Sequence, residues 1–181
     1  MTRPNLLKTN RLASHATAQM LHEMACSFVE EQFSLKGCVP FSWLLANYDN
    51  VAYVETNWTD AHDKVRTTRA MGQFIRENVT AYSFISEAWA LASANIPEDI
   101  RPLVLDWAEN RGLAELPDEF KDDIVMITSF DREGGILMSQ YKVTIRHQRR
   151  GLNFLGPRVD NPMEADKVKG RMWNLFKEPR D

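Results

Sequence analysis

Cysteine is scarce in this chain, and no apolar run is long enough to span a membrane. Only Cys26 and Cys38 occur, so a framework of several disulfides is excluded. One bridge between them is possible in principle, but nothing in the polar N-terminal residues suggests a secretory signal. We therefore expect a cytoplasmic protein with free, reduced thiols and no membrane contact.

An excess of charge of one sign is also missing. The net charge is −3 and the sequence pI is about 5.8, so no global attraction to nucleic acid or to anionic membranes follows. The chain has 181 residues, of which 44% are hydrophobic. That length and composition predict a single globular domain, 1–181, whose core needs no metal or disulfide.

Helical periodicity marks three segments, 14–35, 60–78 and 163–176. In the first, Ser14 is an expected N-cap, and Lys36 with Gly37 provides the basic last turn and the glycine that helix ends favour. In the second, Thr59 or Asp60 is the expected cap. Residues 1–13 are expected to be frayed.

Alternating apolar residues and turn signals predict five strands. Segments 41–47 and 51–57 form one expected hairpin around Tyr48–Asn50, although the first could instead be helical. Residues 80–93 are expected to form the third strand, the central one of the five in sequence order, covered on both faces for part of its length. The sequence "DREGG" predicts a second hairpin between 123–130 and 136–146, followed by a loop.

An acidic insertion at about 92–122 separates the central strand from the second hairpin. Between residues 93 and 123 the sequence has nine acidic and three basic side chains, and three prolines interrupt it. A short helix over about 98–110 is expected there, ended by Gly112.

The expected order is α-β-β-α-β-β-β-α, which predicts an α+β domain with an antiparallel sheet of about five strands and flanking helices. This order is similar to the roadblock, longin and profilin-like topologies. The resemblance is one of topology and implies no activity.

Glu87 lies in the middle of the central strand and is one candidate catalytic residue. A carboxylate on a covered face needs a partner, and such sites are often functional. The alternative that we favour is an exposed acid at the strand end, paired with a base such as Arg146.

An acid on one strand followed by "Gln140-Tyr141-Lys142" on the next resembles the metal-dependent nucleases of the PD-(D/E)xK type. The resemblance implies that Asp123 or Asp131 would hold a metal ion and that Lys142 would orient water. Here Gln140 stands where that family has an acid, and Pro-Asp occurs outside the strand. Asp131 and Lys142 are therefore catalytic candidates of an alternative function.

Soft metal ligands do not form a recognisable motif. His22 and Cys26 are four apart on a helix, but Cys38 and His62 could join them only by folding. Structural and catalytic zinc sites need three or four ligands at characteristic spacings. We predict no metal and no cofactor.

A basic segment, 142–158, contains no acid and includes Arg146, Arg149, Arg150 and the aromatic Phe154. These four are candidate binding residues, since bases interleaved with an aromatic suit phosphates and a stacked base. We favour the alternative that this basic edge complements the acidic insertion, within the molecule or in a neighbour.

Tryptophan and methionine are plentiful, five and eight in number, more than one core accommodates. Surplus aromatic and methionine side chains often mark interfaces. We therefore expect a non-enzymatic binding or regulatory module with a protein partner or a second copy, rather than a nuclease or a nucleic-acid-binding protein.

Overall fold

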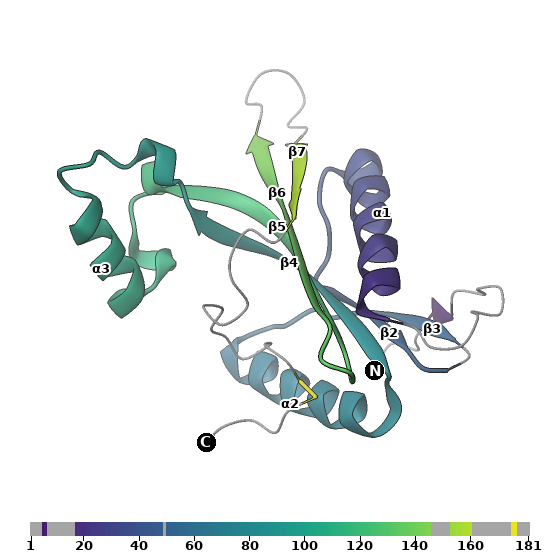
Figure 1. Cartoon of the computed structure of the whole chain (residues 1–181). Helices are drawn as coiled ribbons and strands as arrows, with labels where there is room; N and C mark the ends of the chain where they lie inside the picture. The colour runs from purple at the N-terminus through teal and green to yellow at the C-terminus, as the bar shows by residue number, and fades with distance from the viewer. Residues whose placement is uncertain (1–4, 7–16, 49, 146–152, 161–174, 177–181) are drawn as a thin grey trace.

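Figure 1 shows the computed structural model of the chain, which describes residues 5–6, 17–48, 50–145, 153–160 and 175–176. Its helices are α1 (Ala18–Lys36), α2 (Ala61–Asn78) and α3 (Arg101–Arg111). Its strands are β1 (Asn5–Leu6), β2 (Ser42–Ala46), β3 (Val51–Glu55), β4 (Ala81–Leu91), β5 (Lys121–Asp131), β6 (Ile136–Ile145) and β7 (Asn153–Asp160).

The strands form one antiparallel sheet in the order β1-β3-β2-β4-β5-β6-β7. The predicted α+β class is confirmed, and both predicted hairpins are present as β2–β3 and β5–β6. Residues 42–46 are a strand, so the helical alternative for that segment is wrong. The resemblance to roadblock, longin and profilin-like topologies is not confirmed.

Helix α1 begins at Ala18, four residues after the start expected at residue 14. Its N-cap is Thr17, whose side chain accepts a hydrogen bond from the backbone N–H of Met20, and Ser14 lies outside the described residues. The helix ends at Gly37, which has φ 69° and donates its N–H to the carbonyl of Phe33 at 2.8 Å. Glycine suits this left-handed position because it has no Cβ.

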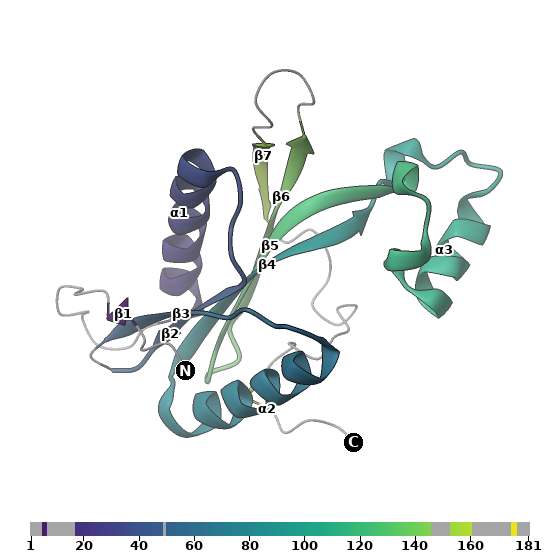
Figure 2. The same ribbon diagram turned by 180° about the vertical axis from the view of Figure 1, so that it is seen from behind.

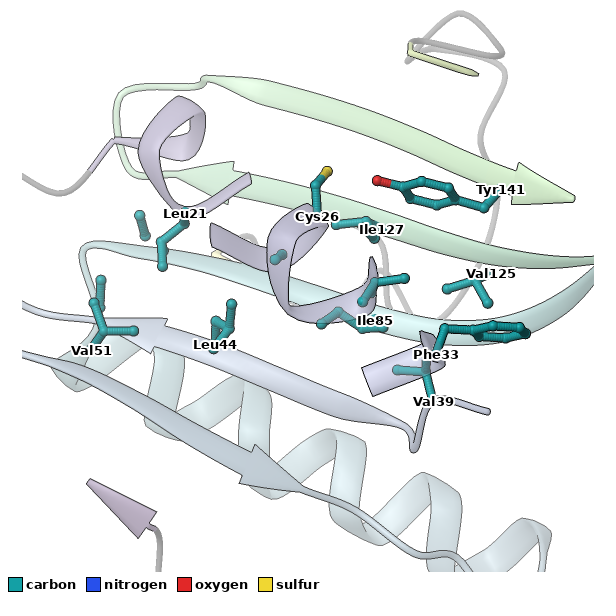
Figure 3. Close-up of a cluster of buried hydrophobic side chains, with 14 residues drawn as sticks. Leu21, Cys26, Phe33, Val39, Leu44, Val51, Ile85, Val125, Ile127 and Tyr141 are labelled. Carbon is teal, nitrogen blue, oxygen red and sulfur yellow. The ribbon is translucent and has the colours of Figure 1, made fainter. Parts of the chain in front are cut away.

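One face of the sheet is covered by α1. The helix buries Leu21, Ala25, Val29 and Phe33, which share one stripe at a spacing of about four residues. Figure 3 shows this stripe over strand residues, among them Leu44, Ile85, Val125 and Ile127. Burial of each large aliphatic side chain stabilises the fold by roughly 1.5–3 kcal/mol, so this layer holds α1 in place.

The opposite face carries a second apolar cluster. Alternation along β4 sends Ala81 and Ile85 toward α1, and Tyr82 and Phe84 to the other side. There they meet α2 and the two described C-terminal residues, in a cluster formed by Trp43, Leu45, Ile75, Val79, Tyr82, Phe84, Phe130 and Leu175. Residues 81–86 are buried and 87–91 are not, as expected of a strand covered on both faces for part of its length.

The outer halves of β4 and β5 leave the body of the molecule. Figures 1 and 2 show from both sides that they carry α3 away from α1 and α2. Residues 92–120 between these strands form α3 and three short 3-10 helices, Ser93–Asn95, Leu113–Glu115 and Asp118–Phe120. Ile96, Val104 and Leu116 give them an apolar cluster of their own. We refer to residues 87–123 as the arm.

Two sequence predictions need correction or fall outside the described chain. The loop expected after residue 146 contains β7, which pairs with β6 in antiparallel fashion across a register shift. Gly156 and Pro157 have low strand propensity, so the sequence did not indicate a strand here. An edge strand tolerates proline because only one of its sides is paired. The helix predicted at 163–176 falls mostly outside the described residues, although Leu175 and Phe176 pack in the second cluster.

None of the helices in the described chain is both long and apolar enough to cross a membrane.

Candidate functional site

A chain of polar side chains is buried where α1 lies on β4, β5 and β6. His22 of α1 contacts two serines, with Nδ1 2.8 Å from Ser129 Oγ and Nε2 2.7 Å from Ser139 Oγ. Ser129 Oγ lies 2.7 Å from Ser83 Oγ, its directly opposite residue on β4. All four side chains are buried, so both ring nitrogens depend on these serines for hydrogen bonds.

Asp160 fixes the direction of the chain of hydrogen bonds. Ser139 and Asp160 are opposite residues on β6 and β7, and the Ser139 hydroxyl donates to the Asp160 carboxylate. Because an ionised carboxylate has no proton to give, Ser139 must accept from His22, which places the ring proton on Nε2. Nδ1 then accepts from Ser129, and Ser129 accepts from Ser83.

Charged side chains surround Asp160, the last residue in this series of hydrogen bonds. Arg158 donates two hydrogen bonds to the Glu23 carboxylate, both at 2.8 Å, and a third from Nε to Asp160 at 2.5 Å. This bidentate geometry ties β7 to α1. The hydrogen bond from Ser139 and then that from Arg158 lower the pKa of Asp160, so its carboxylate stays ionised at neutral pH.

His22 itself is held neutral. Burial is the largest effect that lowers the pKa of its imidazole, and the charge of Arg158 adds to it, while Glu23 and Asp160 oppose it. A neutral ring is what the hydrogen-bond pattern requires, because it needs one donating and one accepting nitrogen. Geometry and electrostatics therefore agree.

Cys26 and Tyr141 lie one helical turn further along. The Tyr141 hydroxyl donates to Glu30 at 2.9 Å, and Figure 3 shows it directed toward Cys26. Burial raises the pKa of both the Cys26 thiol and the Tyr141 phenol. The thiol is thus protonated and enclosed, and it behaves as a small apolar side chain.

The arrangement differs from a nucleophilic triad. In a triad the carboxylate orients the imidazole, whereas here Asp160 contacts a serine and both ring nitrogens of His22 face hydroxyl groups. Ser129 and Ser139 have no exposed surface at which a substrate could be attacked. What the chain of hydrogen bonds can do is hold α1 on the sheet in a way that depends on the protonation of His22.

Glu87 lies on the α1 side of the sheet, just beyond the covered part of β4. It is exposed, and it accepts a hydrogen bond from the backbone N–H of Val39 at 3.3 Å. The pairing with Arg146 that we expected lies outside the described residues. The structure therefore places Glu87 at the base of the arm, where its carboxylate binds the backbone of the segment that follows α1.

The four residues of the nuclease-like hypothesis are not brought together. The β5–β6 register pairs Ile124 with Lys142 and Met126 with Gln140, so Gln140 and Lys142 share the face of even-numbered β5 residues. Asp123 and Asp131 have odd numbers and lie on the other face. Lys142 instead pairs with Asp122 at 2.6 Å, so the geometry does not support a shared metal site.

Asp131 has a structural task at the start of α1. Its Oδ2 accepts the backbone N–H of Ala18 at 3.0 Å, and its Oδ1 accepts that of Gly135 at 2.6 Å. A carboxylate at a helix N-terminus is stabilising because the first N–H groups have no partner within the helix.

The other predicted ligands are dispersed. Cys26 is buried and Cys38 is exposed, and within the described ranges no three His, Cys, Asp or Glu side chains converge on a common metal position. Phe154 is exposed on β7, while Arg146, Arg149 and Arg150 lie outside the described residues. Arg158, at the end of the same basic segment, is engaged by Glu23 and Asp160.

Comparisons with protein-family models, with curated proteins and with solved structures found no match to this chain. Function is therefore inferred from its own residues.

Sequence reasoning considered His22 only as a possible metal ligand beside Cys26, predicted no metal site, and missed the serines. The signal was nonetheless present: Ser83, Ser129 and Ser139 occupy positions where the alternation of each strand requires a buried side chain. Hydroxyl groups at such positions need partners, and a histidine on the apolar face of α1 is one.

Proposed function

We propose that this chain is a non-enzymatic binding module that self-associates, with the arm of one copy seated on the outer face of α2 in a second copy. The observation that carries the proposal is the arm, an acidic projection with apolar side chains exposed at its outer surface.

Helix α3 packs on the rest of the arm through few buried side chains. Val104 is buried in the small cluster, while Leu103 and Leu105 on either side of it are 66% and 48% exposed. Trp89, at the stem of the arm, is 48% exposed, with Lys121 over its ring at 4.9 Å. Large apolar side chains gathered on a projecting element are typical of a contact surface.

Charge complementarity indicates a second copy as the occupant. Ten acids and three bases in residues 87–123 give the arm a net charge of −7, and since the whole chain has −3, the remainder has +4. Helix α2 contains four basic and two acidic side chains, net +2, and exposes Val65 and Phe74. An acidic surface with apolar side chains thus meets a basic one, which favours association and its register.

Sedimentation velocity of the purified protein tests the proposal. We expect an oligomer whose share falls as salt is raised, because screening weakens the attraction between the arm and α2. Leu103→Lys on the arm and Arg69→Glu on α2 should each weaken association at least about tenfold, the effect of losing one central contact. Leu35→Lys makes the same change at a leucine that is 70% exposed on α1, and it should have no effect.

Mixing the two variants identifies which surfaces meet. Leu103→Lys retains an intact α2 and Arg69→Glu retains an intact arm, so an equimolar mixture should associate more tightly than either variant alone. A wild-type protein that stays monomeric at tens of micromolar, or variants that associate like the wild type, would contradict the proposal. Failure of the mixture to recover would contradict the pairing of the arm with α2.

A further inference from the structure

His22 is enclosed by groups that together determine its charge. It is 2% exposed, and its side chain faces the sheet from α1, with one ring nitrogen against Ser129 on β5 and the other against Ser139 on β6. Strand β4 contributes the uncharged Ser83 to this region. The titratable and charged groups around it come from four elements: Glu23, Cys26 and Glu30 on α1, Asp131 at the end of β5, Tyr141 on β6, and Arg158 and Asp160 on β7.

We infer that His22 is a pH-sensitive latch between α1 and the sheet, because the hydrogen bonds that run from Ser83 to Asp160 are arranged for a neutral imidazole and have to be rearranged around a protonated one. Protonation turns Nδ1 from an acceptor into a donor. Ser129, which donates to that nitrogen, must then accept from it and turn its own proton toward Ser83.

Protonation also places a positive charge in a buried site, close to the positive charge of Arg158. Arg158 Nε lies 3.3 Å from Ser139 Oγ, the same oxygen that accepts from His22 Nε2. The carboxylates of Glu23 and Asp160 oppose this repulsion, but both are already engaged by Arg158. Acid therefore weakens the attachment of α1.

The sign follows from linkage between proton binding and folding. Burial lowers the pKa of folded His22 below its ordinary value of 6.5, so between these two values the opened state binds the proton and the closed state does not. The attachment of α1 is at full strength above about pH 6.5 and weakens as the pH falls below it. One proton changes the opening equilibrium by at most about tenfold per pH unit.

Cys26 provides a reporter of this opening because it is buried on the same face of α1, one turn after His22. Cys38 is exposed and would react at every pH. The experiment therefore uses a Cys38→Ser variant, in which Cys26 is the single thiol. Labelling of Cys26 by dithiodipyridine, which reacts with thiols in mild acid, is measured from about pH 7.5 to about pH 5.5. Each rate is divided by that of the urea-unfolded protein at the same pH.

Protection of Cys26 is expected to fall with pH by up to about tenfold per unit below about pH 6.5. His22→Gln keeps a neutral, hydrogen-bonding side chain and should make protection independent of pH. His62 is exposed on α2, so His62→Gln is the matched control and should behave like the wild type. Because the range includes the sequence pI of about 5.8, light scattering checks for aggregation at each pH.

The same pH dependence in His22→Gln as in the wild type would overturn the inference. Nitrogen-edited NMR of the wild-type protein provides a second test that needs no folded variant. We expect the neutral His22 ring to bear its proton on Nε2 and to titrate below the ordinary imidazole range. A proton on Nδ1 at neutral pH, or titration at or above that range, would refute the latch.

Discussion

His22 Nε2 and Ser139 Oγ, 117 positions apart in the sequence, lie 2.7 Å apart beneath α1. Ser139 in turn donates to Asp160, its neighbour across β6 and β7. A helix near one end of the chain is thus connected to a strand near the other by one serine hydroxyl.

Asp160 is expected to select the tautomer of His22. An asparagine at this position can either accept from Ser139 or donate to it, so Asp160→Asn removes the reason for Ser139 to accept from His22. We predict a mixture of Nε2–H and Nδ1–H rings in Asp160→Asn, measured by nitrogen-edited NMR. Asp122→Asn, which alters a carboxylate paired with Lys142 on the other face, should leave the tautomer unchanged. A pure Nε2–H ring in Asp160→Asn would show that the carboxylate does not set the direction.

Asp131 should contribute to stability through the start of α1 and not through catalysis. Asp131→Ala leaves the N–H groups of Ala18 and Gly135 without their acceptor, and we expect a loss of about 1–2 kcal/mol in the free energy of unfolding. Asp123→Ala changes an exposed acid on the same strand and the same face, and it should cost less than about 0.5 kcal/mol. Urea unfolding compares the two variants, and equal stabilities would count against this role.

Tyr82 holds the described C-terminal residues against the sheet. Its hydroxyl accepts the backbone N–H of Leu175 at 2.8 Å in a buried site, so Tyr82→Phe leaves that donor without an acceptor. We predict a loss of about 1–3 kcal/mol, the cost of an unsatisfied buried polar group. Tyr53→Phe removes a weaker contact, the one to Glu55 at 3.4 Å, and serves as the control in the same urea titration. A Tyr82→Phe protein as stable as Tyr53→Phe would show that the hydrogen bond contributes little.

Local signals were sufficient for most elements because helices and hairpins are built from neighbouring residues. Gly37 ended α1 and Asp60 capped α2 as the sequence predicted, and "DREGG" formed the turn between β5 and β6. Strand β7 was missed because its propensity is poor. Its pairing with β6 holds it in the sheet, and no local signal reports such pairing.

The candidate site was less accessible from sequence, although its parts were all visible. Glu87, Asp131 and Lys142 stood out because they are charged, yet each has a structural role. Glu87 accepts a backbone N–H, Asp131 accepts one at the start of α1, and Lys142 pairs with Asp122. The buried serines did not stand out, because a serine in a strand is unremarkable until its face is known. Ionisable residues attract notice by type, whereas the significance of a hydroxyl depends on its burial.

The amino-acid sequence by itself determined the three described helices, β4, the strands of the two hairpins and the acidity of the arm, because periodicity, caps and charge are properties of consecutive residues. Only the tertiary structure decided which side chains meet. Strand register placed Asp131 and Lys142 on opposite faces, and the seating of α1 placed His22 between Ser129 and Ser139. Contacts between residues more than a hundred positions apart depend on the whole fold, so no local pattern specifies them.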